Sequence, residues 1–303
     1  MAVHELGEGP PVLLIHGFPE LAFSWRHQLP ALADAGYRAI APDMRGYGGS
    51  DKPPKVTDYA IDRLIGDITG LMDALGLDKA VVAGHDWGAL VVWQMALTRP
   101  ERMAGLIALN IPFFKRPPID PILYMRLKFG RRLYIVNFQD SDEADRRFAE
   151  DPAHFIDVMM RRRRREGGDR PKKRRSAISL LELLDQAEPD GEPLLSRDEL
   201  DVYAEAFAAG GFTGPINWYR NFTRNWKAAR HIEQIVRVPA LFVGARHDVV
   251  VSPRQIEAME PCVTDLEIHM IENCGHWTQQ EKPGELNAVM IEWLGRHYPV
   301  SAR

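Results

Sequence analysis

Short apolar runs alternate along the chain with longer stretches in which apolar positions recur every three or four residues. The short runs are nearly continuously apolar and rich in β-branched residues, which is typical of parallel strands buried on both faces. They predict strands over residues 11–15, 37–41, 79–83, 103–109, 239–244 and 266–271.

The longer stretches predict helices over residues 24–35, 58–75, 89–98, 253–259 and 283–297. Ser24 is a suitable cap for the first, and Pro253 and Pro283 stand at first-turn positions, where a missing N–H is tolerated. Pro100 ends the third helix. This alternation predicts an α/β fold built on a doubly wound, mostly parallel sheet.

The alternation breaks between about residues 111 and 231, a region that is helical in character and rich in aromatic residues and arginine. It resumes at residue 239. We therefore expect a core domain of residues 1–110 and 232–303 and an inserted helical cap, or lid, of residues 111–231. Ligands of such sheets bind beyond the carboxyl ends of the strands, so an insertion at that edge can roof the site.

Composition excludes several classes. Hydrophobic residues make up 45% of the chain, as in ordinary globular proteins, and no apolar stretch is long enough to span a membrane. The first twenty residues lack the pattern of a secretory signal. A disulfide between Cys262 and Cys274 is conceivable, but two buried thiols in a reducing cytosol fit better, so we expect a cytoplasmic protein.

The formal net charge of −4 hides a basic run over residues 161–175 that holds ten basic and two acidic side chains. Such a run could bind nucleic acid or an acidic membrane surface. No aromatic residues are interleaved to stack on bases, so we interpret it as a solvated surface excursion and expect no nucleic-acid partner.

The residues Gly84-His85-Asp86-Trp87-Gly88 lie between a predicted strand and a predicted helix, the context of a nucleophile elbow. The middle residue of such an elbow is strained, and the two flanking glycines allow strand and helix to approach closely. Here the middle residue is aspartate rather than serine. The plainer alternative is that Asp86 only caps the following helix.

Two further residues follow in the order that this arrangement requires, nucleophile, acid and then histidine. Asp248 comes just after the predicted strand over 239–244, and His276 just after that over 266–271. Alone, each would be read as a turn residue or a structural histidine. Their common position at carboxyl ends of strands predicts a catalytic triad of Asp86, Asp248 and His276.

The loop His16-Gly17-Phe18-Pro19 directly follows the first strong strand. A glycine-bearing loop at this place can present a backbone N–H toward the elbow and, with the N–H of Trp87, form an oxyanion hole. The alternative is a plain tight turn.

With these motifs, the chain resembles the α/β-hydrolase-fold epoxide hydrolases of the soluble type. The resemblance runs from about Gly7 to Trp293. Its motifs are His16-Gly17-Phe18-Pro19, Asp43-Met44-Arg45-Gly46-Tyr47-Gly48-Gly49-Ser50, Gly84-His85-Asp86-Trp87-Gly88 and Cys274-Gly275-His276-Trp277. It implies that epoxides and water are converted to vicinal diols through an ester on Asp86, with no metal, flavin or nucleotide cofactor.

The resemblance also implies two cap tyrosines that hold the epoxide oxygen. Tyr219, in Asn217-Trp218-Tyr219-Arg220-Asn221, matches one closely; Tyr134 fits the other, with Tyr124 as its rival. The oxyanion hole then consists of the N–H groups of Phe18 and Trp87, and the Phe18–Pro19 bond is cis. The family usually has two antiparallel strands before the first motif. Here only a stub over residues 2–6 is present, so we expect a sheet edge one strand short.

Two other functions remain open. Dehalogenases use the same ester chemistry, and Trp87 does not separate them from epoxide hydrolases. Haloalkane dehalogenases commonly carry Asn where this chain has Phe18 and lack the paired tyrosines, whereas haloacetate dehalogenases tend to have Arg beside the nucleophile. A serine esterase is disfavoured by Asp86. A non-catalytic binding protein on a hydrolase scaffold is disfavoured by the complete triad.

Overall fold

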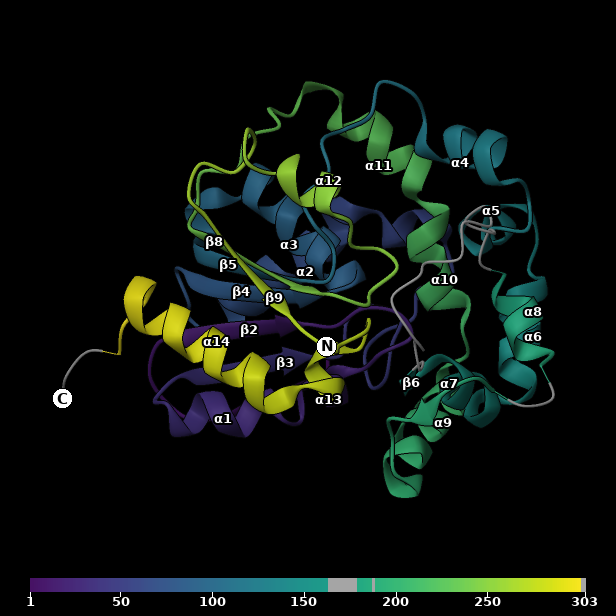
Figure 1. Ribbon diagram of the computed structural model, residues 1–303, viewed down its shortest axis with the longest axis horizontal. Coiled ribbons are helices and arrows are strands. Elements are labelled where there is room, and N and C mark those ends of the chain that lie inside the picture. Colours follow the sequence, from purple (N-terminus) through teal and green to yellow (C-terminus); the bar gives the residue numbers. More distant parts are fainter. Residues whose placement is uncertain (163–178, 187–188, 301–303) are drawn as a thin grey trace. The chain divides into compact units, whose positions relative to one another are not determined.

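The computed structural model describes residues 1–162, 179–186 and 189–300 (Figure 1). Contacts divide the chain into two compact units. The core unit comprises Met1–Asp51, Ile61–Lys115 and His231–Arg303, and the inserted unit comprises Lys52–Ala60 and Arg116–Arg230.

The core unit is built on a seven-stranded sheet whose strands lie in the order β1-β3-β2-β4-β5-β8-β9. Its strands are β1 (Val3–Leu6), β2 (Pro11–Ile15), β3 (Arg38–Pro42), β4 (Ala80–His85), β5 (Met103–Leu109), β8 (Ala240–Ala245) and β9 (Leu266–Ile271). All neighbouring strands are parallel except β1 and β3. The predicted doubly wound, mostly parallel sheet is therefore confirmed.

The stub at the amino terminus forms the edge strand β1, which pairs with β3 through Val3↔Pro42 to Leu6↔Ala39. Within the residues that the structure describes, no strand pairs on its outer side, as expected. All four residues of β1 are exposed. A short edge strand limits the unpaired backbone that would otherwise promote association.

The core unit contains the helices η1 (Ala22–Trp25), α1 (Gln28–Asp34), α2 (Ile61–Ala74), α3 (Trp87–Thr98), η3 (Pro100–Arg102), α12 (Pro253–Glu257), α13 (Thr278–Glu281) and α14 (Pro283–His297). Of these, η1, α1, α3 and α14 pack against strands of the sheet. The predicted starts at Pro253 and Pro283 and the end before Pro100 are confirmed.

Two of the predicted helices start later than expected, because the residues predicted as their first turns form separate 3-10 turns. Residues 24–35 form a 3-10 turn and a separate helix, so Ser24 is buried inside η1, and His27 occupies the cap position of α1. Residues 58–75 are likewise interrupted at Ala60, whose backbone is extended (φ −64°, ψ 153°) between η2 (Val56–Tyr59) and α2. A 3-10 turn that leads into a helix has nearly the same apolar spacing as one helix, so the pattern could not separate them.

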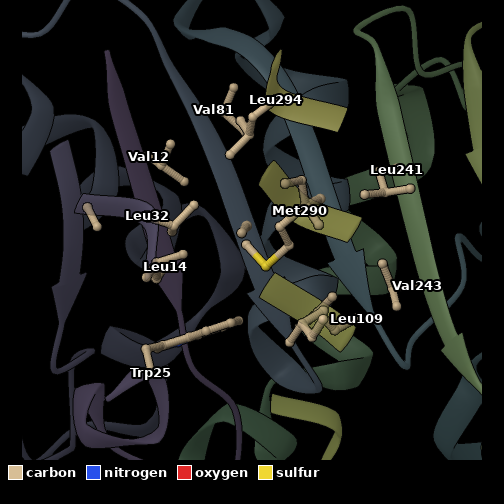
Figure 2. Close-up of a cluster of buried hydrophobic side chains, with 14 of the residues drawn as sticks. Val12, Leu14, Trp25, Leu32, Val81, Leu109, Leu241, Val243, Met290 and Leu294 are labelled. Carbon is tan, nitrogen blue, oxygen red and sulfur yellow. The ribbon is translucent and has the colours of Figure 1, made fainter. Parts of the chain in front are cut away.

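One face of the sheet carries the main apolar cluster, in which side chains of β2, β4, β5 and β8 meet α1 and α14 (Figure 2). Val12, Leu14 and Val81 contribute from the strands, and Met290 and Leu294 from α14. The residues between them, such as Leu13 and Val82, are equally buried because successive strand side chains point to opposite faces. Burial on both faces explains the continuous apolar runs.

The inserted unit is mainly helical. It contains η2, α4 (Pro121–Phe129), α5 (Tyr134–Asp140), α6 (Glu143–Glu150), α7 (Pro152–Met159), α8 (Leu180–Leu184), α9 (Arg197–Gly210), α10 (Thr213–Arg220) and α11 (Phe222–Ala228), followed by η4 (Ala229–His231). Two-residue strands β6 (Arg161–Arg162) and β7 (Glu192–Pro193) pair with each other. Its interior is aromatic, with Phe148 stacked on Phe155 at 3.8 Å and Phe207 on Phe212 at 4.5 Å between ring centroids.

The basic run lies mostly outside the described residues, since residues 163–178 are not described. For its first residue, Arg161, the prediction of a solvated side chain is wrong. The guanidinium pairs with Asp157 at 2.6 Å and donates to the carbonyl oxygen of Gly191 at 2.9 Å. Arg161 therefore ties α7 to the segment before β7.

Both cysteines are buried and free, as predicted. In the part of the chain that the structure describes, no helix combines the length and apolar character needed to cross a bilayer.

Candidate active site

The nucleophile elbow joins β4 to α3. Asp86 stands between them with φ 52° and ψ −118°, a conformation that costs a non-glycine residue about 1–3 kcal/mol. A Cβ atom on Gly84 would collide with the backbone of Gly88, and one on Gly88 with the backbone of Ile15. The predicted strained turn with two obligatory glycines is therefore confirmed.

The structure brings together Asp86, Asp248 and His276, which follow β4, β8 and β9. The Nδ1 atom of His276 lies 2.8 Å from Oδ2 of Asp248, and its Nε2 atom lies 3.4 Å from Oδ2 of Asp86. Asp248 is buried, whereas the His276 side chain is 24% exposed. The histidine thus lies between the two carboxylates and keeps part of its side chain exposed.

The negative charges of Asp86 and Asp248 and a positive charge on His276 stabilise one another. Burial would raise the pKa of Asp86, but the hydrogen bond and positive charge of His276 lower it below its usual range. Burial would likewise lower the pKa of His276, but Asp248 and then Asp86 raise it well above its usual range. The lowered pKa of Asp86 favours its carboxylate form, and the raised pKa of His276 favours its protonated form.

The loop that contains Phe18 approaches the elbow directly. The backbone N–H of Phe18 donates to Oδ1 of Asp86 at 3.0 Å, and the Phe18–Pro19 bond is cis, as expected. A side chain on Gly17 would collide with that of Asp86. Trp87, the other predicted donor, is the first residue of α3. A backbone donor already aimed at the Asp86 carboxyl can stabilise negative charge that develops there.

His16 holds this loop in place. Its Nε2 atom accepts the backbone N–H of Met44 at 2.9 Å, so its Nδ1 atom carries the proton and donates to the Gly17 carbonyl oxygen at 3.0 Å. Burial lowers the pKa of His16, which keeps the ring neutral in this arrangement. His16 is thus a structural tie between the loops after β2 and β3.

Sequence reasoning missed a buried pair beneath the elbow, Glu20 and His85. Nδ1 of His85 lies 2.7 Å from Oε2 of Glu20, and Nε2 lies 2.7 Å from the carbonyl oxygen of His276. The same Glu20 oxygen accepts the N–H of Gly17 at 2.8 Å. Burial would raise the pKa of Glu20, but His85 lowers it, so Glu20 is a carboxylate. Both ring nitrogens of His85 lie within hydrogen-bonding distance of oxygen atoms, so His85 and Glu20 join the loop before Phe18 to His276.

The predicted tyrosines belong to the inserted unit, and two of the three lie together there. The rings of Tyr134 (α5) and Tyr219 (α10) are 5.6 Å apart, and both pack against Phe138. Their helices are also joined by Gln139, whose Nε2 donates to the Tyr219 carbonyl oxygen at 2.9 Å. Tyr124, on α4, is 42% exposed, and its hydroxyl accepts from Lys128 at 2.7 Å. Of the two alternatives, Tyr134 is the one whose ring contacts that of Tyr219.

Among the described residues, no group of three or more histidine, cysteine, aspartate or glutamate side chains is arranged to hold a metal ion.

Comparison with known proteins agrees with this geometry. The family model of the α/β hydrolase fold matches residues 10–283. The chain is 43% identical to epoxide hydrolase A of Mycobacterium tuberculosis, over 97% of this chain and 94% of that protein. It is 39% identical to bifunctional epoxide hydrolase 2 of Sus scrofa over 96% of this chain, but it spans only 52% of that longer protein.

Two crystal structures show the same similarity in three dimensions. Epoxide hydrolase A of Mycobacterium thermoresistibile superimposes with a TM-score of 0.86 at 39% identity, covering 96% of this chain and 93% of that one. Epoxide hydrolase I of potato (Solanum tuberosum) gives a TM-score of 0.84 at 33% identity, covering 97% and 95%. Since these similarities extend over nearly the whole chain, it belongs to the epoxide hydrolases of the α/β-hydrolase fold.

Proposed function

We propose that this chain hydrolyses small-molecule epoxides to vicinal diols through a covalent ester on Asp86. The observation that carries the proposal is a carboxylate at a strained elbow, contacted by the Phe18 N–H and faced by a histidine–aspartate pair. An ionised carboxylate in this position is suited to nucleophilic attack. The relatives named as epoxide hydrolases support the same chemistry.

In the first step, an oxygen of Asp86 attacks one epoxide carbon from the side opposite the carbon–oxygen bond that breaks. The departing oxygen is a poor leaving group unless it receives a proton. Tyr134 and Tyr219 supply hydrogen bonds and then a proton to it, since phenols remain protonated at neutral pH, with a pKa of about 10 in water. In this proposal residues 111–231 act as the cap that carries both tyrosines.

In the second step, His276 takes a proton from water, and the water oxygen attacks the ester carbonyl carbon of Asp86. The N–H groups of Phe18 and Trp87 stabilise the resulting oxyanion, and one such donor is typically worth about 3–4 kcal/mol of barrier. On collapse, His276 gives its proton to the departing diol oxygen, and the remaining proton of the attacking water passes from the Asp86 carboxyl group to His276. This restores the carboxylate beside a protonated histidine. No metal or organic cofactor enters either step.

His276 must change from an acid to a base between the steps, and ester formation provides the cause. The ester carries no charge, so His276 loses one of the two carboxylates that raise its pKa. Its pKa then falls toward the usual range while Asp248 still orients the ring, so His276 releases a proton to solvent. The tyrosine that protonated the epoxide oxygen regains a proton from solvent, which balances this loss. Alkylation of Asp86 thus prepares the base for the step that follows.

The Asp86→Asn variant should reproduce this change without substrate. We expect the pKa of His276 to be clearly lower than in the wild type, because a neutral amide replaces a carboxylate 3.4 Å from Nε2. Titration of 13C-labelled histidine side chains by NMR measures this, and the other histidines in the same spectra serve as controls. An unchanged or higher pKa would contradict the proposed role of Asp86.

A single-turnover reaction in 18O-labelled water tests the proposed function. With enzyme in excess over styrene oxide, the first diol should contain no label, because its new oxygen comes from Asp86. The label should appear in the peptide that carries Asp86, since water attacks the ester carbonyl carbon. Absence of diol would refute the activity, and labelled diol in the first turnover would instead indicate direct attack by water.

We further propose that the protein acts in the cytosol, which its two buried free thiols support. The basic run remains a predicted solvated surface segment from Arg162 onward, and no nucleic-acid partner is part of the proposal.

A further inference from the structure

A buried amide, that of Asn110, lies against the acid of the candidate triad. Asn110 follows β5 with φ 66° and is fully buried, and its backbone N–H donates to the carbonyl oxygen of Val243 on β8 at 2.9 Å. Its Nδ2 atom donates to Oδ2 of Asp248 at 2.8 Å and lies 3.3 Å from the carbonyl oxygen of Gly275. Asn110 therefore contacts both the acid and the residue before His276.

Thr278 contacts the other end of this amide. The Thr278 hydroxyl donates to Oδ1 of Asn110 at 2.8 Å and is fully buried. In the reversed orientation, the amide oxygen would face the Asp248 carboxylate, and the amide nitrogen would take the place of that acceptor. The Asp248 carboxylate and the Gly275 carbonyl oxygen can only accept, so they face the amide nitrogen. The Thr278 hydroxyl stabilises this orientation by donating to the amide oxygen.

The carboxylate of Asp248 depends on this donor. Its Oδ2 atom accepts from both His276 and Asn110, at 2.8 Å each, and its Oδ1 atom accepts from the N–H of Val250 at 2.9 Å. Because the side chain of Asp248 is completely buried, water cannot readily replace a lost donor. A carboxylate deprived of one fixed donor is less stable and less precisely oriented.

We infer that Asn110, oriented by Thr278, is a positioning residue that holds the Asp248 carboxylate where His276 needs it to act as a base. The inference rests on the proposed covalent reaction and specifies the step concerned. Alkylation uses the carboxylate of Asp86 and requires no base. Ester hydrolysis requires His276 to accept a proton, so loss of the Asn110 amide should slow that step selectively.

The Asn110→Gly variant tests this without straining the backbone, because glycine adopts a positive φ readily. We expect alkylation by styrene oxide to stay within about threefold of the wild-type rate. Ester hydrolysis should slow by about tenfold to a hundredfold, as expected for loss of a hydrogen bond to a charged group. Rapid-quench mass spectrometry, which follows the ester on Asp86, measures both rates.

A second pair of variants removes only the orienting hydroxyl. Thr278→Val keeps the shape of the side chain, and we expect several-fold slower hydrolysis with unchanged alkylation. Thr278→Ser keeps the hydroxyl and should restore hydrolysis to near the wild-type rate. The matched control for Asn110→Gly is Asn273→Gly, at an exposed asparagine with φ 50°, which should leave both rates unchanged.

The outcomes separate the inference from the proposed function. A wild-type enzyme that forms no ester on Asp86 would refute the proposed function itself. An ester in the wild type, with both rates unchanged or equally reduced in Asn110→Gly and Thr278→Val, would overturn the role of Asn110 alone. If Asn110→Gly does not fold, the comparison of Thr278→Val with Thr278→Ser decides.

Discussion

Replacing His276 with glutamine should stop the reaction at the alkylated enzyme. Asp86 can still attack the epoxide, because the N–H of Phe18 and the nearby charge of His85 continue to stabilise its carboxylate. Glutamine cannot accept the proton of the attacking water, so the ester persists. Since general base catalysis contributes about 10²–10⁴-fold, steady-state turnover should fall by about a thousandfold or more.

Intact-protein mass spectrometry under saturating styrene oxide should show His276→Gln enzyme plus one substrate mass, located on the peptide that carries Asp86. The double variant with Asp86→Ala should show no adduct. His4→Gln, on the exposed strand β1, is the matched control and should turn over like the wild type. An unmodified His276→Gln enzyme without turnover would contradict the assignment of Asp86 as nucleophile.

The order of events in the proposed reaction follows from the electrostatics of Asp86, Asp248 and His276. Before substrate binds, two carboxylates share one protonated histidine, and this keeps Asp86 ionised despite its burial. After alkylation, only Asp248 remains charged beside His276, which is the arrangement of a general base oriented by an acid. The same histidine therefore serves first as a counter-ion and then as a base.

Much of the core unit could be predicted because its local signals agree with one another. Strands buried on both faces leave continuous apolar runs, so β2 and β5 begin and end at the predicted residues. The edge strand β9, which is only partly buried, also has the predicted bounds. The elbow combines glycines, a strand and a helix within a few residues. The order of the triad residues along the chain and their positions at strand ends were enough to predict Asp248 and His276 without knowledge of their contacts.

The residues that support the site could not be predicted in this way. Glu20 and His85 pair across 65 positions, and Asn110 meets Asp248 across 138. Each is one polar residue beside an apolar run, and nothing in its neighbourhood shows its partner. The choice between Tyr134 and Tyr124 also depends on tertiary packing, since both lie in predicted helical sequence at similar distances from the motif of Tyr219.

The Tyr219→Phe variant should slow epoxide opening by about tenfold to a thousandfold, and the double variant with Tyr134→Phe should lose nearly all of it. The expected range follows from the contribution of general acid catalysis, about 10²–10⁴-fold. Folding should survive, because each change deletes only one hydroxyl and the ring contacts with Phe138 remain.

These variants should differ from His276→Gln in the step that they affect. The tyrosines act on the departing epoxide oxygen, so in their absence ester formation slows and no ester accumulates, whereas His276→Gln accumulates it. Tyr124→Phe is the matched control, because the hydroxyl of Tyr124 is engaged by Lys128 on an exposed helix face. We expect its rate to stay within about threefold of the wild type.

The same measurements separate epoxide hydrolysis from dehalogenation. A halide leaves without a proton and needs only weak donors around an anion, so the two phenols are superfluous for it. Phe18 cannot donate from its side chain, which leaves Trp87 without the second side-chain donor common in haloalkane dehalogenases. We therefore expect little bromide release from short bromoalkanes by the wild type. Fast bromide release, together with an epoxide rate indifferent to both tyrosine changes, would refute the epoxide reaction and favour the dehalogenase.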